Sequence, residues 1–327
     1  EGWSWGVIRA ELGALYAHEL GLGALPAPAP RYADYAAREA EEIAGPHMQS
    51  HVDYWLAQFA GGSPPVLELP FGRPRPSVRS YRSRRVDGLL DATLVDALRA
   101  LAARSGTSLY AALFGAFAGL LHRLTGQEDL VIGIASAGQA ASGMPGLVGH
   151  CVNLLPMRVA VNGSMPFDAL LGQSRGLLHD AMEHQDLGYG ALLKKLLLPR
   201  DASRPPLVSV LFNLDAGGEQ APAEFAGLRT ALHSIPRACE NFELFLNLTP
   251  VAGGMRWEAQ YNTALFDGES VARWMGMYQR LLGAVLREPG VALGSVDLLD
   301  DREEARLLAL QPAPTPLLRS GLMHAGF

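Results

Sequence analysis

The sequence predicts an α/β sandwich, in which helices pack on a mixed β-sheet. Amphipathic stretches of helical period alternate with apolar runs of strand length along the chain. The largely apolar run at 129–135 is typical of a buried strand. Gly253-Gly254 lies between two strand-length segments and indicates a β-hairpin. Together these three observations predict a sheet with flanking helices rather than a helical bundle or an all-β fold.

Stop and cap residues bound the expected helices. Ser4 caps a stripe formed by Ile8, Leu12, Leu15, Tyr16 and Leu20, and Gly21 and Gly23 end that helix. Thr107 is the expected cap of a later helix that Gly126 stops. Helices are expected at 5–20, 32–44, 47–60, 91–104, 107–125, 167–183, 188–198 and 267–287, and strands at 129–135, 152–161, 207–214, 242–251 and 255–262.

The strongest linker signal is Gly61-Gly62-Ser63-Pro64-Pro65. We therefore expect residues 1–62 to close one lobe and residues 63–298 to form a second. Residues 299–327 lose helical periodicity and contain three prolines, so an exit linker is expected there.

Composition excludes several classes of protein. The net charge of −6 comes without a clustered basic face, which argues against nucleic-acid binding. No apolar run approaches 18 residues, so no membrane span is expected, and the two cysteines and the lack of a leader-like start favour a cytoplasmic protein. His47 and His51 are one helical turn apart, but no third metal ligand is evident, so we expect a surface pair and predict no metal site.

Five short segments carry the functional signal. They are Glu1-Gly2-Trp3-Ser4, Tyr32-Ala33-Asp34-Tyr35-Ala36, the stretch from Val148 to Arg158, His184-Gln185-Asp186, and the stretch from Arg200 to Leu207. In this order and spacing they resemble the motifs of condensation domains from nonribosomal peptide synthetases. That family shares the fold of chloramphenicol acetyltransferase, doubled into two lobes, and the resemblance runs from residue 1 to about residue 300.

The resemblance implies an amide-forming acyltransferase within a multidomain synthetase. The parent would join a carrier-bound acyl or peptidyl thioester to a carrier-bound aminoacyl acceptor. Donor and acceptor peptidyl carrier proteins would deliver both substrates on phosphopantetheine arms, with no directly bound cofactor. An adenylation domain is expected next along the chain, because Met323 to Phe327 resemble the approach to one.

Glu1 to Ser4 resemble the end of His-His-x-x-x-Asp-Gly-Trp-Ser, the catalytic loop of the family. The catalytic histidine is then expected four residues before Glu1. This chain would be a fragment that lacks most of the N-terminal lobe and is inactive alone. Glu1 stands where the family has aspartate, and we expect it to pair with Arg158; the alternative is that Arg158 is a solvated strand end. Gly2 is expected to provide a permissive backbone angle or a close approach; the alternative is an ordinary loop glycine.

The resemblance also implies substrate-side residues, each with a structural alternative. Asn153 would face the tunnel between the lobes, or be a hydrogen-bonded core amide. His184 and Asp186 would line the tunnel, or form a polar cap network. Ser203 and Arg204 would lie near the acceptor, or belong to a turn held by Asp and Ser side chains. Cys151 and His150 are adjacent in the sequence, just before the predicted strand, and adjacent residues of an extended segment point to opposite faces, so a Cys–His nucleophile is rejected.

Two other functions remain open. One is a condensation-like module that recruits partners without chemistry. The other is a free-standing acyltransferase that uses coenzyme A or a soluble amine. Two histidines upstream of Glu1 would favour catalysis, and continuation into an adenylation domain would argue against the free-standing enzyme.

Overall fold

A computed structural model describes residues 2–70, 72–215, 225–231 and 233–310. The chain divides into two compact units, Glu1–Val296 and Asp297–Phe327. The lobe boundary that we expect at residues 62 and 63 falls inside the first unit and stays a prediction.

The first unit is built on a six-stranded sheet with the order β1-β6-β5-β4-β2-β3. Strand β4 is parallel to both β2 and β5, and the other pairs are antiparallel, so the sheet is mixed as predicted. Gly253 adopts a φ of 86° in the turn between β5 and β6, which confirms the predicted hairpin. The strands are β1 Ser83–Asp91, β2 Asp129–Ala137, β3 Val152–Ala160, β4 Val210–Leu214, β5 Leu244–Val251 and β6 Gly254–Asn262.

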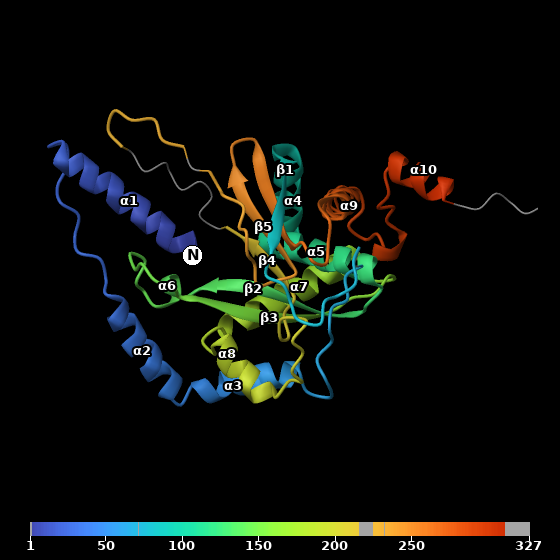
Figure 1. Cartoon of the computed structure of the whole chain (residues 1–327), viewed down its shortest axis with the longest axis horizontal. Helices are drawn as coiled ribbons and strands as arrows, with labels where there is room; N and C mark the ends of the chain where they lie inside the picture. Colours follow the sequence, from blue (N-terminus) through green and yellow to red (C-terminus); the bar gives the residue numbers. More distant parts are fainter. Residues whose placement is uncertain (1, 71, 216–224, 232, 311–327) are drawn as a thin grey trace, which may run out of the picture. The chain divides into compact units, whose positions relative to one another are not determined.

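Four helices, α4, α5, α7 and α9, pack against one another and against the sheet (Figure 1). Asp91, Ser108 and Asp267 cap α4, α5 and α9, because each side chain accepts a hydrogen bond from a backbone N–H of the first turn. The helices of the first unit are α1 Gly2–Glu19, α2 Tyr32–Ala44, α3 Met48–Gln58, α4 Ala92–Arg104, α5 Leu109–Thr125, α6 Gly138–Ala141, α7 Phe167–Glu183, α8 Tyr189–Leu196, α9 Gly268–Arg287 and the short 3₁₀ turn η1 Leu293–Ser295.

The core centres on Phe212 of β4. Its ring contacts those of Phe114 and Phe117 on α5, with centroid distances of 5.8 and 5.6 Å. Tyr278 of α9 closes the cluster and donates its hydroxyl to the Leu113 carbonyl at 2.8 Å. This arrangement satisfies the one polar group of a buried tyrosine while its ring adds to the apolar contact area.

The two faces of the sheet differ in chemistry. Along β6, Met255, Trp257, Ala259 and Tyr261 form the apolar set, and Tyr261 reaches the start of α9 beside Gly268. The alternate residues are polar, and Glu258 forms ion pairs with Arg85 at 3.1 Å and Arg256 at 3.2 Å. One face therefore meets the helices, while the opposite face carries a row of paired charges and amides.

Helix α1 differs from the sequence interpretation in what it buries. The helix is present as predicted, but it begins at Gly2, so Ser4 lies inside its first turn and is not its cap, and only Ser4 and Gly13 are buried. The predicted apolar stripe is exposed instead, with Leu12 at 54% and Leu15 at 41% relative exposure. Helical period establishes a helix, but burial depends on what packs against it.

Three local expectations are corrected. Ser108 caps α5 in place of Thr107, one residue later. Strand β1 was not predicted, because its arginines and Asp87 interrupt the alternation of apolar and polar residues that is typical of a strand. In the second unit, residues 301–309 form helix α10, begun by a capping box of Asp300 and Glu303, where we expected only a linker. The expected adenylation-domain approach at 323–327 lies outside the described residues. None of the described helices combines the length and apolar character needed to span a bilayer.

Candidate functional site

Three of the five predicted motif segments meet at Gly149. The Ser4 hydroxyl donates to the Gly149 carbonyl at 3.0 Å and accepts from the Gly149 N–H at 3.1 Å. Tyr32 donates its hydroxyl to the His150 carbonyl at 3.0 Å. A Cβ on Gly149 would lie 2.2 Å from the Tyr32 ring, so this contact requires glycine. The start of α1, the start of α2 and the approach to β3 are thereby joined at one point.

We call the contacts of Gly149 with Ser4 and Tyr32 the motif junction. Further contacts lie next to it. Trp3 donates its indole N–H to the Pro145 carbonyl at 2.8 Å. Cys151 is buried in a small cluster with Tyr35 and Leu147. Burial raises the pKa of Tyr35 well above its ordinary value. Cys151 is thus packed against α2, which agrees with our rejection of a Cys–His nucleophile.

Asp215, directly after β4, is a residue that the sequence did not single out. Its carboxylate accepts hydrogen bonds from Asn213 at 3.1 Å, Asn247 at 3.2 Å and Thr249 at 2.8 Å. A Cβ on Gly2 would lie 3.9 Å from Asp215 Oδ1, so the end of β4 borders the first residue of α1. In the sequence, Asp215 is only an acidic residue at the end of a predicted strand. Such residues are common, so the site cannot be identified until the pairing of the strands is known.

Asn153 holds the turn between α7 and α8. Its amide nitrogen donates to the Gln185 and Leu187 carbonyls at 2.7 and 2.9 Å. Its amide oxygen accepts from Leu154 N at 2.9 Å and Tyr189 N at 3.0 Å. These contacts match the alternative interpretation of Asn153 as a hydrogen-bonded amide. A substrate contact for Asn153 stays a prediction.

The same turn continues to the motif that begins at Arg200. Ser136 donates its hydroxyl to the Gln185 side-chain oxygen, and Tyr189 donates its own to the Pro206 carbonyl at 2.6 Å. Burial raises the pKa of Tyr189. Leu207 then takes a φ of 61°, which is unusual for a branched side chain. One network therefore links β2, β3, α8 and the loop that enters β4.

His184 and Asp186 both face His51 of α3. The Nδ1 atoms of His184 and His51 are 3.2 Å apart, and Asp186 Oδ2 lies 3.7 Å from His51 Nε2. Tyr54 stacks on His184 with a centroid distance of 4.1 Å, and Trp55 donates to the His184 carbonyl at 2.8 Å. His51 is 13% exposed, so the expectation of a surface histidine pair with His47 is wrong for His51. The contacts dock α3 on the end of α7.

Arg158 binds the carboxylate of Asp129 on the neighbouring strand. Its guanidinium donates to Asp129 at 2.7 and 3.0 Å and to the Gln58 carbonyl at 2.7 Å. The hydrogen bonds to Asp129 raise the pKa of Arg158. In the β2–β3 register Arg158 lies opposite Val131, whereas the motif junction adjoins the other end of β3. Glu1 lies outside the described residues, so the pair with Arg158 stays a prediction, but the described contacts give Arg158 a different role.

Ser203 and Arg204 belong to a turn held by Asp201. Ser203 donates its hydroxyl and its N–H to Asp201 Oδ1 at 2.6 and 2.8 Å, and these bonds lower the pKa of Asp201. Arg204 contacts Asp201 at 3.0 Å and Glu68 at 2.8 Å. This is the structural alternative that the sequence left open.

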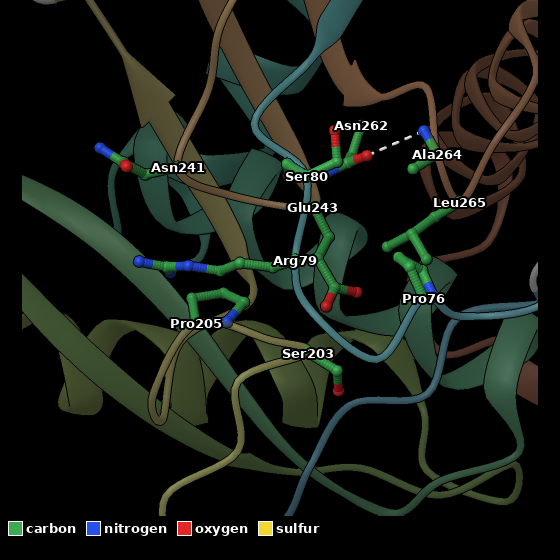
Figure 2. Close-up of a pocket in the computed structure, with 10 residues that line it drawn as sticks. All are labelled: Pro76, Arg79, Ser80, Ser203, Pro205, Asn241, Glu243, Asn262, Ala264 and Leu265. Atoms are coloured by element: carbon green, nitrogen blue, oxygen red, sulfur yellow. Dashed lines mark hydrogen bonds between the residues drawn. The ribbon is translucent and has the colours of Figure 1, made fainter.

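A shallow pocket adjoins this turn (Figure 2). Glu243 projects into it and forms a bidentate pair with Arg75 at 2.7 and 3.1 Å. Arg75 also donates to the Ser203 carbonyl at 3.2 Å, which fixes the turn to the segment before β1. Ser203 is the one predicted site residue in the lining. The lining residues are Pro76, Arg79, Ser80, Ser203, Pro205, Asn241, Glu243, Asn262, Ala264 and Leu265.

Comparison with known proteins identifies the family. Residues 1–308 match the Condensation domain family. The chain belongs to that family. The resemblance of the five motif segments to condensation domains of nonribosomal peptide synthetases is thereby confirmed, together with the predicted fold.

The curated relatives of this condensation domain are large peptide synthetases and synthases. Phosphinothricin tripeptide synthetase PhsC of Streptomyces viridochromogenes is 34% identical over 316 residues, which is 96% of this chain and 29% of the relative. Chondramide synthase cmdD of Chondromyces crocatus is 31% identical over 94% of this chain and 8% of its own length. The condensation domain therefore spans only a small part of the proteins it matches.

Solved structures share its fold. The X-domain from teicoplanin biosynthesis superposes with a TM-score of 0.79 at 24% identity, over 91% of this chain and 69% of the X-domain chain. The four-domain nonribosomal peptide synthetase AB3403, solved with AMP and glycine, gives a TM-score of 0.80 at 20% identity, over 93% of this chain and 24% of its own.

Proposed function

We propose that this condensation domain belongs to a synthetase that forms an amide bond between a carrier-bound acyl or peptidyl thioester and a carrier-bound aminoacyl acceptor. The observation that carries the proposal is the motif junction. Ser4, Tyr32 and Gly149 come from three motifs of the catalytic family, and they hold the start of α1 against the approach to β3. The catalytic loop of the family leads directly into that helix.

The reaction joins two tethered substrates. The acceptor amine attacks the thioester carbonyl carbon, the C–N bond forms, and the C–S bond breaks to release the donor thiol. The amine loses a proton that the leaving thiolate takes up, and an imidazole near the amine would orient or transfer it. The family assigns that imidazole to the histidine expected four residues before Glu1. The phosphopantetheine arms belong to the partner carrier proteins, in a cytoplasmic synthetase with a following adenylation domain.

The described residues would supply the support for this chemistry. The Asn153 and Tyr189 network fixes the turn after α7, and the Arg75–Glu243 pair fixes the turn that carries Ser203. Rigid supports of this kind keep reacting groups within a narrow range of geometry. Substrate-lining roles for Asn153, His184, Asp186, Ser203 and Arg204 are part of the proposal.

The test compares two proteins in one assay. The intact synthetase and the chain of residues 1–327 are each mixed with a donor-loaded and an acceptor-loaded carrier protein, and the amide product on the acceptor arm is followed by mass spectrometry. Product from the intact synthetase, and none from residues 1–327, is expected. Loss of product on replacing the upstream histidine by alanine would support its assignment. Product from residues 1–327 alone would overturn the location of the catalytic group.

A recruitment module is the second candidate. It is favoured by one solved structure of the same fold, the X-domain in complex with OxyB from teicoplanin biosynthesis, with a TM-score of 0.77 at 23% identity. An intact synthetase that makes no amide but retains a partner protein would support it.

A further inference from the structure

Asp215 lies on the polar face of the sheet. Among the described residues, all the hydrogen-bond partners of its carboxylate are neutral. Its three hydrogen-bond donors are Asn213, Asn247 and Thr249, and none carries charge. On the same face, Glu258 is paired with Arg85 and Arg256. Within the described part of the chain, no ion pair of Asp215 is recorded. Its negative charge is thus oriented by the strands, and no described cation is paired with it.

The element that approaches this charge is the N-terminus of α1. The first N–H groups of a helix lack intrahelical partners and form the positive end of the helix dipole. From Gly2 onward, the first turn of α1 contains no acidic residue that would complement it. A Cβ on Gly2 would lie 3.9 Å from Asp215 Oδ1, so the carboxylate stands against the helix start.

The neutral donors give the carboxylate a fixed direction. Asn213 and Asn247 face each other across β4 and β5, and their side chains are bonded at 2.7 Å. Thr249 lies two residues further along β5 and bonds Asp215 Oδ2, while Asn213 bonds Oδ1, the oxygen that lies beside Gly2. The end of β4 therefore presents a preoriented anion to α1.

We propose that Asp215 is a positioning residue that holds the N-terminus of α1, and with it the loop that enters α1, over the end of β4. The importance of this loop rests on the proposed function, in which it carries the catalytic histidine. Asp215 acts through the helix and not on the reacting atoms. A Cβ on Gly2 would make only an ordinary contact with Asp215 Oδ1 at 3.9 Å, so the arrangement does not itself require glycine at this position.

The first test measures hydrogen exchange of the backbone amides of residues 3–5 in the intact synthetase. Asp215→Asn keeps the shape and removes the charge. A carboxylate at a helix start stabilises it enough that exchange of these amides is expected to rise about fivefold. The rise should shrink at high salt, because salt screens the charge. Asp215→Glu restores the charge and should recover part of the protection.

The second test separates positioning from general stability by amide-forming kinetics. Asp215→Asn should lower kcat about tenfold while KM for both loaded carriers stays within about twofold, since a misplaced loop affects the reaction step more than binding. Asp87→Asn is the matched control, because Asp87 lies on the same face but is paired with Arg85 at 2.6 Å. It should leave kcat and the exchange of residues 3–5 unchanged.

The outcomes are distinguishable. Exchange that rises only in β4 and β5 after Asp215→Asn, with residues 3–5 unchanged, would overturn the inference and leave Asp215 as a link between strands. A wild-type synthetase that makes no amide would overturn the proposed function, while the exchange measurement would still decide the role of Asp215.

Discussion

Helices α1 and α5 are similar in length, with 18 and 17 residues, yet α5 is the more apolar of the two and they differ in what surrounds them. Every residue of α5 from Ala111 to His122 is buried, whereas α1 buries only Ser4 and Gly13. Helix α5 is held by apolar packing along its whole length. Helix α1 has fewer contacts: Trp3 and Ser4 in its first turn bond backbone groups near β3, and Tyr16 packs on Phe225 with a centroid distance of 5.7 Å. Two helices of similar length thus differ in that one is packed on all sides and the other is held by a few contacts.

The largest loss of stability is expected from a substitution in the buried helix α5. Phe117 of α5 is fully buried between Phe212 and Tyr278. Phe117→Ala should lower the free energy of unfolding by about 3–5 kcal/mol, because it removes buried area and leaves a cavity. Urea unfolding of residues 1–327 measures this as a lower midpoint at constant slope. A loss below about 1 kcal/mol would mean that α5 is not the centre of the core.

Gly149→Ala probes the first-turn anchor of α1. The new methyl group would meet the Tyr32 ring, so the ring must leave, at a cost of about 1–3 kcal/mol by analogy with overpacked sites. Gly146→Ala is the matched control, since its Cβ would make only an ordinary contact at 3.6 Å from Pro30. Thermal unfolding measures both variants.

Tyr32→Ala in the Gly149→Ala background should recover part of the loss. The two changes are then non-additive in a double-mutant cycle, as expected for residues in contact. Additive losses would show that the glycine is required for some other reason.

Asp267 tests how a helix with its own cap differs from α1. Its carboxylate accepts a hydrogen bond from Ser270 N, and this bond, opposed in part by burial, lowers the pKa of Asp267. Asp267→Ala should lower the free energy of unfolding by about 1 kcal/mol near neutral pH. Because the folded pKa lies below the unfolded one, the unfolded state binds more protons. The contribution of the charge is complete above the unfolded pKa of about 3.9 and is lost as pH falls through the folded pKa.

The measurement for Asp267 is unfolding by urea at neutral and acidic pH. Asp267→Asn keeps a side-chain acceptor without the charge, so it should remain closer to wild type than Asp267→Ala does. A difference between wild type and Asp267→Ala that grows on acidification would contradict the assigned sign.

The smallest effect is expected on the outer face of α1. Leu12 is 54% exposed, so Leu12→Ser should change the free energy of unfolding of residues 1–327 by less than about 0.5 kcal/mol. The urea midpoint again measures it. If Leu12→Ser lowered the free energy of unfolding by several kcal/mol, Leu12 would be packed like a core residue, and α1 and α5 would not differ in burial as described.

Local patterns predicted much of the fold. Helix α7 has the expected bounds of 167–183, because its apolar period is flanked by Pro166 and a polar end. Strand β1 was missed because its polar side chains are satisfied by partners far along the chain, such as Glu258 for Arg85. The burial of α5 and the exposure of the stripe on α1 also depend on distant segments, which periodicity does not report.

The sequence predicted those site residues that lie in short family motifs. It did not predict which residues, far apart in the sequence, contact one another. Tyr32, Gly149 and Ser4 lie in predicted segments, but their mutual contact follows only from the fold. Glu243 and Asp215 carry no local signal, because a lone acidic residue near a strand end is common. The described partner of Arg158, Asp129, lies on the adjacent strand, and the sequence did not single out this pair for the same reason.

The burial of Cys151 has a practical consequence for studying these contacts. The chain has two cysteines, and Cys239 is exposed while Cys151 is packed behind Tyr35. In a Cys239→Ser background, a maleimide reagent can reach the remaining thiol only when α2 moves away. The labelling rate would then report how often this part of the molecule opens, and it would do so without an activity assay.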